Sequence, residues 1–248
     1  MKKIVVLLAL AVCSVLSARE FEYALVKAEK SPEFRANNYK RTLAKFPANT
    51  PVIDVDLLAK PEELKKYKRI FIYDVPRIFT VEQLSGMEKY VSEGGLLVTC
   101  SIISDIDTNG DGKGDFSLIA RVKKRKAGHP RPNDFPPTGV MAHSASDIKN
   151  VTAKMECPLT VGFKVNEAMP RNMHFRAVTL KNGIVVMSAE AVLKNKKVEK
   201  QMPLITICNR DKGSFVFMPF EKDFIKNALS AQTLDWLTDQ GSTDAGAK

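Results

Sequence analysis

The chain has 248 residues, 44% of them hydrophobic, and its 38 lysines and arginines outnumber 28 acidic residues to give a formal net charge of +10. A chain of this length can bury a sizeable core as one domain. Four cysteines in so long a chain exclude a disulfide-stapled scaffold. The positive charge would suit an anionic partner such as nucleic acid, an anionic polysaccharide or lipid head groups.

The first eighteen residues have the three-part pattern of a secretory signal peptide. Residues 1–3 carry two lysines, residues 4–12 form an apolar run, and residues 14–18 resemble a cleavage region. The apolar run is too short to span a bilayer, and Val12 before Cys13 does not suit a lipoprotein signal. We therefore expect export to the periplasm or the cell exterior, no stable membrane insertion after cleavage and no nucleic-acid partner. Without the two lysines of the signal, the charge becomes +8.

Residues 19–240 are predicted to form one α/β domain whose first part alternates strands with helices. Short, β-branched and aromatic runs predict strands at 21–27, 51–55, 69–75 and 96–99. A helix between the last two begins after Thr80, where Gln83 completes a capping box, and ends at Gly94 and Gly95. This alternation predicts a mainly parallel sheet with helices on both faces.

The second half of the chain differs from the first in composition and in its pattern of predicted elements. Residues 121–138 form a basic, proline-rich insertion that cannot hold regular structure. Strands are expected at 175–180, 184–189, 203–208 and 214–219, and the tight turns between them predict some antiparallel pairing. One amphipathic helix at 224–237 precedes a flexible tail at 241–248. A second basic cluster, at residues 194–200, reads as a solvated loop or as a contact for an anionic partner.

Several phrases of this sequence resemble the class I glutamine-amidotransferase-like superfamily, in particular a secreted accessory branch related to the trehalose-utilisation-protein type. A strand that ends at Asp74 precedes a helix that finishes in the YVSEGG phrase of residues 90–95. The CPLTVGF phrase of residues 157–163 and the strands at 203–206 and 212–217 continue the likeness. The resemblance implies a flavodoxin-like sheet and, for the accessory branch, a role beside sugar-active or surface-assembly modules.

Cys100 follows the YVSEGG helix at the place where, by this resemblance, active amidotransferases carry their nucleophile. A nucleophile elbow needs small residues on both sides of the thiol, as in G-x-C-x-G, whereas the neighbours here are Val98, Thr99, Ser101 and Ile102, so both glycines are missing. The downstream His-x-Glu of the family is also absent, because none of the three histidines is followed by glutamate in that pattern. The amidotransferase machinery is therefore not evident, and a buried structural cysteine is the favoured interpretation.

The DTNGDGKGD run has the ligand order of a calcium loop. Its oxygen donors would be the side chains of Asp107, Asn109, Asp111 and Asp115 and the carbonyl of Lys113. Leu118 stands where a bidentate glutamate should close the site, and Asp/Gly-rich runs are also ordinary turns. The prediction is a Ca²⁺-ordered loop, with no other cofactor.

Ligands of open α/β sheets bind beyond the carboxyl ends of the parallel strands. The candidate ligand-binding residues at that edge are Asp74, Arg77, Ser101, Ser104 and Asp105. A carboxylate at a strand end is equally often a cap.

The leading functional hypothesis is an exported, non-catalytic binding or scaffolding module for carbohydrate or a cell-surface partner. Two alternatives remain open. One is a hydrolase that uses carboxylates, with Asp74 or the loop acids and a calcium-ordered loop. The other is a thiol-dependent enzyme built on Cys100.

Overall fold

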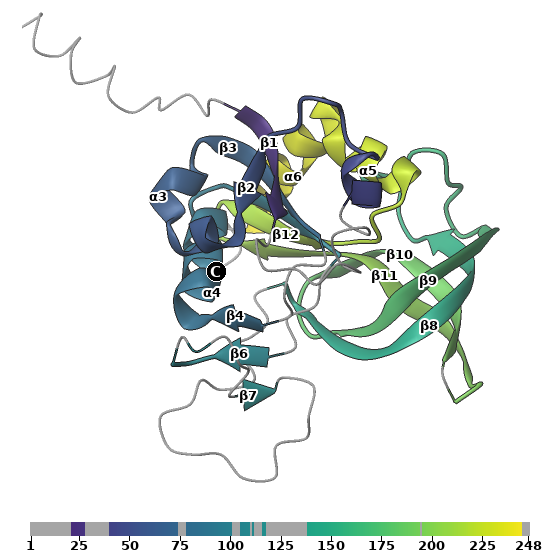
Figure 1. Ribbon diagram of the computed structural model, residues 1–248. Coiled ribbons are helices and arrows are strands. Elements are labelled where there is room, and N and C mark those ends of the chain that lie inside the picture. Colours follow the sequence, from purple (N-terminus) through teal and green to yellow (C-terminus); the bar gives the residue numbers. More distant parts are fainter. Residues whose placement is uncertain are drawn as a thin grey trace, which may run out of the picture.

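The computed structural model describes residues 21–27, 40–73, 78–100, 105–109, 111, 116–117, 138–193 and 195–244 (Figure 1). The predicted signal peptide at 1–18 and nearly all of the predicted insertion at 121–138 lie outside these residues. Within the described ranges, no helix is both long enough and apolar enough to cross a bilayer.

The fold is built on one nine-stranded sheet in the order β2-β1-β3-β5-β12-β11-β10-β8-β9. Its parallel strands are β1 (Phe21–Lys27), β2 (Val52–Asp54), β3 (Tyr67–Ile72), β5 (Leu96–Thr99) and β12 (Gly213–Phe217). The antiparallel part adds β8 (Val140–Ala153), β9 (Ala168–Leu180), β10 (Ile184–Leu193) and β11 (Val198–Arg210). A small second sheet holds β4 (Ile78–Thr80), β6 (Asp105–Asp107) and β7 (Phe116–Ser117).

Helices accompany the parallel strands. They are the 3₁₀ turn η1 (Val55–Ala59), α3 (Pro61–Leu64), α4 (Val81–Ser92), α5 (Lys222–Leu229) and α6 (Ala231–Asp244), and a second 3₁₀ turn, η2 (Pro158–Thr160), follows β8. The antiparallel strands curve away from the helical part of the molecule (Figure 1).

The predicted mainly parallel, flavodoxin-like sheet is wrong. The sheet is mixed, and its antiparallel strands are 10 to 14 residues long, so most of its paired residues are antiparallel. The sequence prediction failed because it omitted β8 entirely and began β9 seven residues late. Polar residues alternate with apolar ones along both strands, as a sheet with one solvated face requires.

The predicted single helix at 224–237 is also wrong, because the chain breaks at Ser230. This residue is extended, with a ψ of 147°, and its hydroxyl accepts a hydrogen bond from the Thr233 N–H at 3.1 Å. Ser230 therefore caps a second helix, and the segment folds into α5 and α6.

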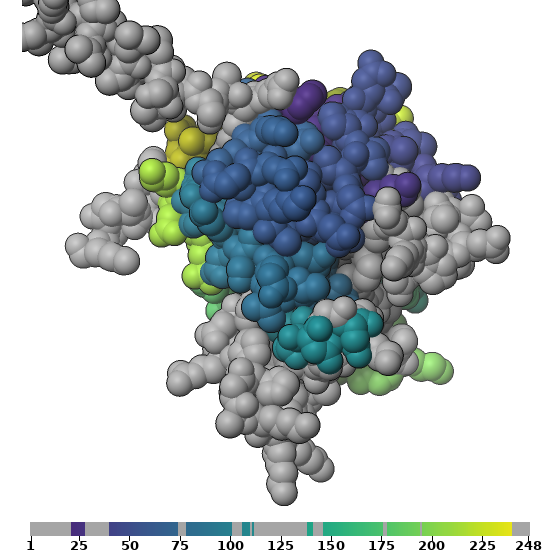
Figure 2. Space-filling view, turned by 60° about the vertical axis from the view of Figure 1, so that its left-hand side comes forward, coloured from purple at the N-terminus to yellow at the C-terminus, as the bar shows by residue number. Residues whose placement is uncertain are grey.

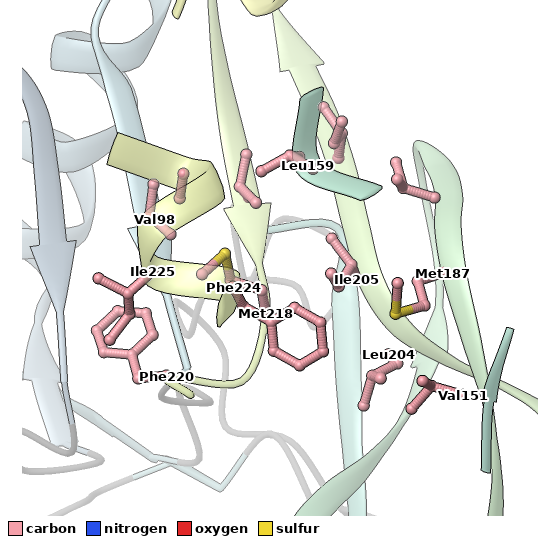
Figure 3. Packing of buried hydrophobic residues seen from close by; sticks show 14 of the residues in the cluster. Val98, Val151, Leu159, Met187, Leu204, Ile205, Met218, Phe220, Phe224 and Ile225 are labelled. Atoms are coloured by element: carbon pink, nitrogen blue, oxygen red, sulfur yellow. The ribbon is translucent and has the colours of Figure 1, made fainter. Parts of the chain in front are cut away.

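The central parallel strands separate two hydrophobic clusters, one on each face. In β3, Ile70 and Ile72 pack with α4, whereas Phe71 points to the opposite face. That opposite cluster contains Phe224 and Ile225 of α5 and continues under the antiparallel strands (Figure 3). Strands that are buried on both faces have continuous apolar sequences, which explains why β3 and β5 could be predicted from the sequence.

Helix α4 starts as the sequence predicts and packs closely on η1. Thr80 accepts a hydrogen bond from the Gln83 N–H, and the Gln83 side chain accepts one from the Thr80 N–H, so the capping box is confirmed. Gly86, in the middle of the helix, faces the backbone of η1. A Cβ added there would lie 2.1 Å from the carbonyl oxygen of Leu58.

Replacing Gly86 with alanine should therefore destabilise the protein, although alanine is the better helix former by about 1 kcal/mol. We expect the clash to force α4 away from η1 at a net cost of about 1–3 kcal/mol, measured by urea unfolding. The control is Ser85→Ala, on the exposed side of the same helix, which should be neutral or slightly stabilising. A stabilised G86A variant would contradict this packing.

A buried arginine ties β3 to β1 and to the α5–α6 junction. Arg69 is only 3% exposed. Its guanidinium donates to the carbonyl oxygens of Ala228 at 3.0 Å and Ser230 at 2.8 Å, and to the Glu22 carboxylate at 3.0 Å. Hydrogen bonds from Lys68 and then Arg69 hold the pKa of Glu22 below its ordinary value of 4.5.

The Glu22 carboxylate should stabilise the fold in a pH-dependent way. A pKa lowered on folding means that this contribution is present above pH 4.5 and is lost as the pH falls through the lowered pKa. We expect Glu22→Gln to unfold at lower urea concentration than the wild type at pH 7, and the difference to shrink below pH 4.5. A difference that stays constant down to the acid transition would show that the ion pair does not contribute.

Candidate functional site

The candidate site lies where the parallel strands end, between β1 and β3. The chain passes from β1 to β2 on one side and later to β3 on the other, so the strand order reverses at this pair. In open sheets with parallel strands, such a reversal leaves a crevice outside the carboxyl ends of the two strands. Of the predicted residues at this edge, Asp74, Arg77, Ser101 and Ser104 lie outside the described part of the chain.

The described part of this edge carries an aromatic pair that the sequence analysis did not single out. The Tyr73 ring, directly after β3, stacks on Phe220 with 5.9 Å between ring centroids and 23° between planes. Phe220 is 4% exposed and also contacts Phe46 and Phe71 edge-on. The partly exposed Tyr73 ring therefore rests on a buried aromatic base.

A charged pair borders the same rings. The Lys45 ammonium donates to the Phe220 carbonyl oxygen at 2.6 Å and lies 3.3 Å from a carboxylate oxygen of Glu221. Because Phe220 and Glu221 follow β12, these contacts fix the segment after β12 against the segment before β2. Together the rings and the ion pair form a polar and aromatic rim at the carboxyl edge.

Cys100 also lies at this edge, at the end of β5. Its N–H donates to the Ile72 carbonyl oxygen at 3.3 Å, and its thiol lies 3.9 Å from the same oxygen. The thiol is partly exposed and unbridged, whereas Cys157 and Cys208 are free and buried. His174, the histidine whose side chain is described, lies on β9 and pairs with Asp147 on β8. These are the fifth and fourth strands beyond β5 in the sheet order.

The described residues of the predicted calcium loop form a chain of side-chain turns. The Asp107 carboxylate accepts from the Asn109 N–H at 3.2 Å, and the Asn109 side-chain oxygen accepts from the Asp111 N–H at 2.9 Å. Asp107 is buried, whereas Asn109 and Asp111 are exposed. Lys113 and Asp115 lie outside the described residues, as does the side chain of Asp105, whose backbone belongs to β6. Among the side chains that are described, no three His, Cys, Asp or Glu groups converge as a metal site would require.

Three solved structures of β-galactosidases share this fold. The enzyme from Bacillus circulans sp. alkalophilus matches with a TM-score of 0.56 and 16% identity over 90% of this chain and 31% of its own. The enzyme from Rahnella sp. R3 matches with a TM-score of 0.55 and 14% identity over 87% of this chain and 32% of its own. A catalytic mutant of the GH42 enzyme from G. stearothermophilus matches with a TM-score of 0.54 and 13% identity over 86% of this chain and 30% of its own. The chain thus spans about a third of their length, and at these identities the likeness shows the fold alone.

No family model and no curated protein matches this chain. The amidotransferase-like assignment is wrong, because the similar folds are those of β-galactosidases and the sheet is mixed. The YVSEGG phrase has a local physical cause. Gly94 has a φ of +97°, and a Cβ on Gly95 would lie 2.3 Å from the buried Tyr90 ring. This sequence motif therefore indicates a tight helix-to-strand turn and does not identify a protein family.

The three cysteines in the described part of the chain should differ in their reactivity in the folded protein. Cys100 is partly exposed, Cys157 is buried, and burial raises the pKa of the Cys208 thiol. Because the thiolate is the reactive form, we expect iodoacetamide at neutral pH to modify Cys100 first and Cys208 last, as read by peptide mapping. All three should react in urea. Equal rates of modification of all three thiols in the folded state would contradict the burial of Cys157 and Cys208.

Proposed function

We propose that this protein is an exported, non-catalytic binding module and that its ligand is carbohydrate held at the carboxyl edge between β1 and β3. The observation that carries the proposal is the Tyr73 ring, which is partly exposed at the strand-order reversal and stacked on the buried Phe220. Ligand sites combine apolar and aromatic surface with a few polar groups. Tyr73 supplies the ring, and the Lys45–Glu221 pair supplies the polar groups.

Carbohydrate is the first ligand class to test for two reasons. The apolar C–H face of a sugar ring packs well against an aromatic ring, and Tyr73 is partly exposed. Solved structures that share this fold include β-galactosidases, which makes galactose-containing oligosaccharides the first choice. Export rests on the predicted signal peptide.

The non-catalytic part of the proposal rests on the sequence, which has Val98 and Ile102 at the glycine positions of a nucleophile elbow around Cys100 and no His-x-Glu motif. A thiol nucleophile needs a neighbouring base or another group that lowers its pKa. In the described part of the chain, His174 is engaged with Asp147 in the antiparallel part of the sheet.

The test is calorimetric titration of the mature protein with galacto-oligosaccharides. We expect Tyr73→Ala to weaken binding by about tenfold, which corresponds to about 1.4 kcal/mol of lost stacking. Phe21→Ala is a matched control, because Phe21 also stacks on another ring, Tyr67, at 5.5 Å, but lies at the opposite end of β1. Binding by the control should equal that of the wild type.

Two results would contradict the proposal. Absence of heat with any neutral or charged oligosaccharide would remove carbohydrate as the ligand. Release of chromophore from a nitrophenyl galactoside, abolished by substitution of Asp74 or Cys100, would instead show a catalytic protein.

A further inference from the structure

The hairpin between β10 and β11 projects from the body of the molecule. It forms the tip at the lower right of Figure 1, and its green atoms also extend beyond the surface at the lower right of Figure 2. The turn is held by hydrogen bonds from the Lys196 N–H to the Leu193 carbonyl at 2.8 Å and from the Leu193 N–H to the Lys197 carbonyl at 2.9 Å. The Asn195 side chain accepts from the Lys197 N–H at 3.1 Å. The tip is therefore a defined structure.

This tip concentrates positive charge. Residues 194–200 contain four lysines and one glutamate, a net charge of +3. Lys196, Lys197 and Lys200 are exposed, and Lys197 pairs with Glu199 at 2.6 Å. The pair neutralises part of the charge, and Lys196 and Lys200 are exposed to water.

An apolar side chain stands among these lysines. Val198 is 49% exposed and lies opposite Val192 in the β10–β11 register. An exposed β-branched residue at the start of a protruding strand contributes nothing to the core. About half of its apolar surface is therefore available for contact with a partner, between the charged neighbours Lys197 and Glu199.

We propose that the β10–β11 tip is a peripheral docking surface for an anionic lipid bilayer. The lysines contact the phosphate groups, and Val198 enters the head-group layer. A convex tip fits a flat surface better than it fits a flexible polymer, which a concave groove would grip. An anionic polysaccharide would also leave Val198 without a partner. This inference is independent of the proposed carbohydrate site, which lies at another part of the sheet.

The experiment is co-sedimentation of the mature protein with vesicles of phosphatidylglycerol and phosphatidylcholine, against vesicles of phosphatidylcholine alone. Each lysine near an anionic surface contributes roughly fivefold in partitioning, so we expect the triple variant Lys196→Gln, Lys197→Gln, Lys200→Gln to lose at least tenfold. Binding should weaken as the salt concentration rises. The matched control changes Lys164, Lys222 and Lys226 to glutamine, removing the same charge from η2–β9 and α5.

A second pair of variants tests the contribution of Val198. Val198→Ser should lower partitioning about threefold or more, because the apolar contact is lost. Ile184→Ser, at the other end of β10 and 40% exposed, should leave it unchanged. Circular dichroism should show all of these variants folded.

Three outcomes would overturn the proposal. The first is no binding to anionic vesicles, and the second is an equal loss in the control triple variant, which would show a general charge effect. The third is binding to dextran sulfate that Lys196→Gln, Lys197→Gln, Lys200→Gln abolishes, while vesicles are not bound; that would assign the tip to a soluble polyanion.

Discussion

Strand β12 is the element on which the two halves of this molecule depend. It pairs in parallel with β5 on one side and antiparallel with β11 on the other, and all five of its residues are buried. Its first residue must be glycine, because a Cβ on Gly213 would lie 2.2 Å from the Val91 carbonyl oxygen and 2.3 Å from that of Gly95. The Ser214 N–H then donates to the Gly95 carbonyl oxygen at 3.2 Å. The end of α4 and the start of β12 therefore fix each other.

This arrangement gives the two proposed surfaces a common scaffold. The chain that leaves β12 at its carboxyl end places Phe220 beneath Tyr73 and Glu221 beside Lys45. The chain that enters β12 comes from β11, whose far end carries the basic tip. A carbohydrate site and a membrane-facing tip would thus be held by one continuous sheet, which is a simple way to present a bound glycan at a defined orientation to a cell surface.

The sequence revealed the elements whose signals are local. The capping box of Thr80 and Gln83 and the apolar runs of β3 and β5 were predicted and are confirmed. Parts of β9, β10 and β11 were predicted, but β8 was missed, because it mixes Ser, Asp and Lys with apolar residues and only its pairing with β9 and β10 shows why. Chain order in the first half favoured a parallel sheet, which the antiparallel pairing of β8, β9, β10, β11 and β12 overturned.

The site was harder to predict than the fold. Tyr73 gains its role from Phe220, which lies 147 residues further along the chain and has no local pattern that connects the two. The one signal available in the sequence was that Tyr73, an aromatic residue with a polar hydroxyl, directly follows a predicted strand next to the point where the strand order reverses. The roles given to Asp74, Arg77, Ser101 and Ser104 stay predictions, as does the calcium site.

If β12 unites the two halves, the whole sheet should unfold as one cooperative unit. Native-state hydrogen exchange at increasing urea concentration, resolved by peptide, measures this. We predict that amides of β3, β5, β11 and β12 exchange only through one global opening, with the same free energy and the same dependence on urea. If the amides of β8 to β11 instead exchanged through a separate opening of lower free energy while the parallel strands stayed protected, the claim of a single scaffold would be contradicted.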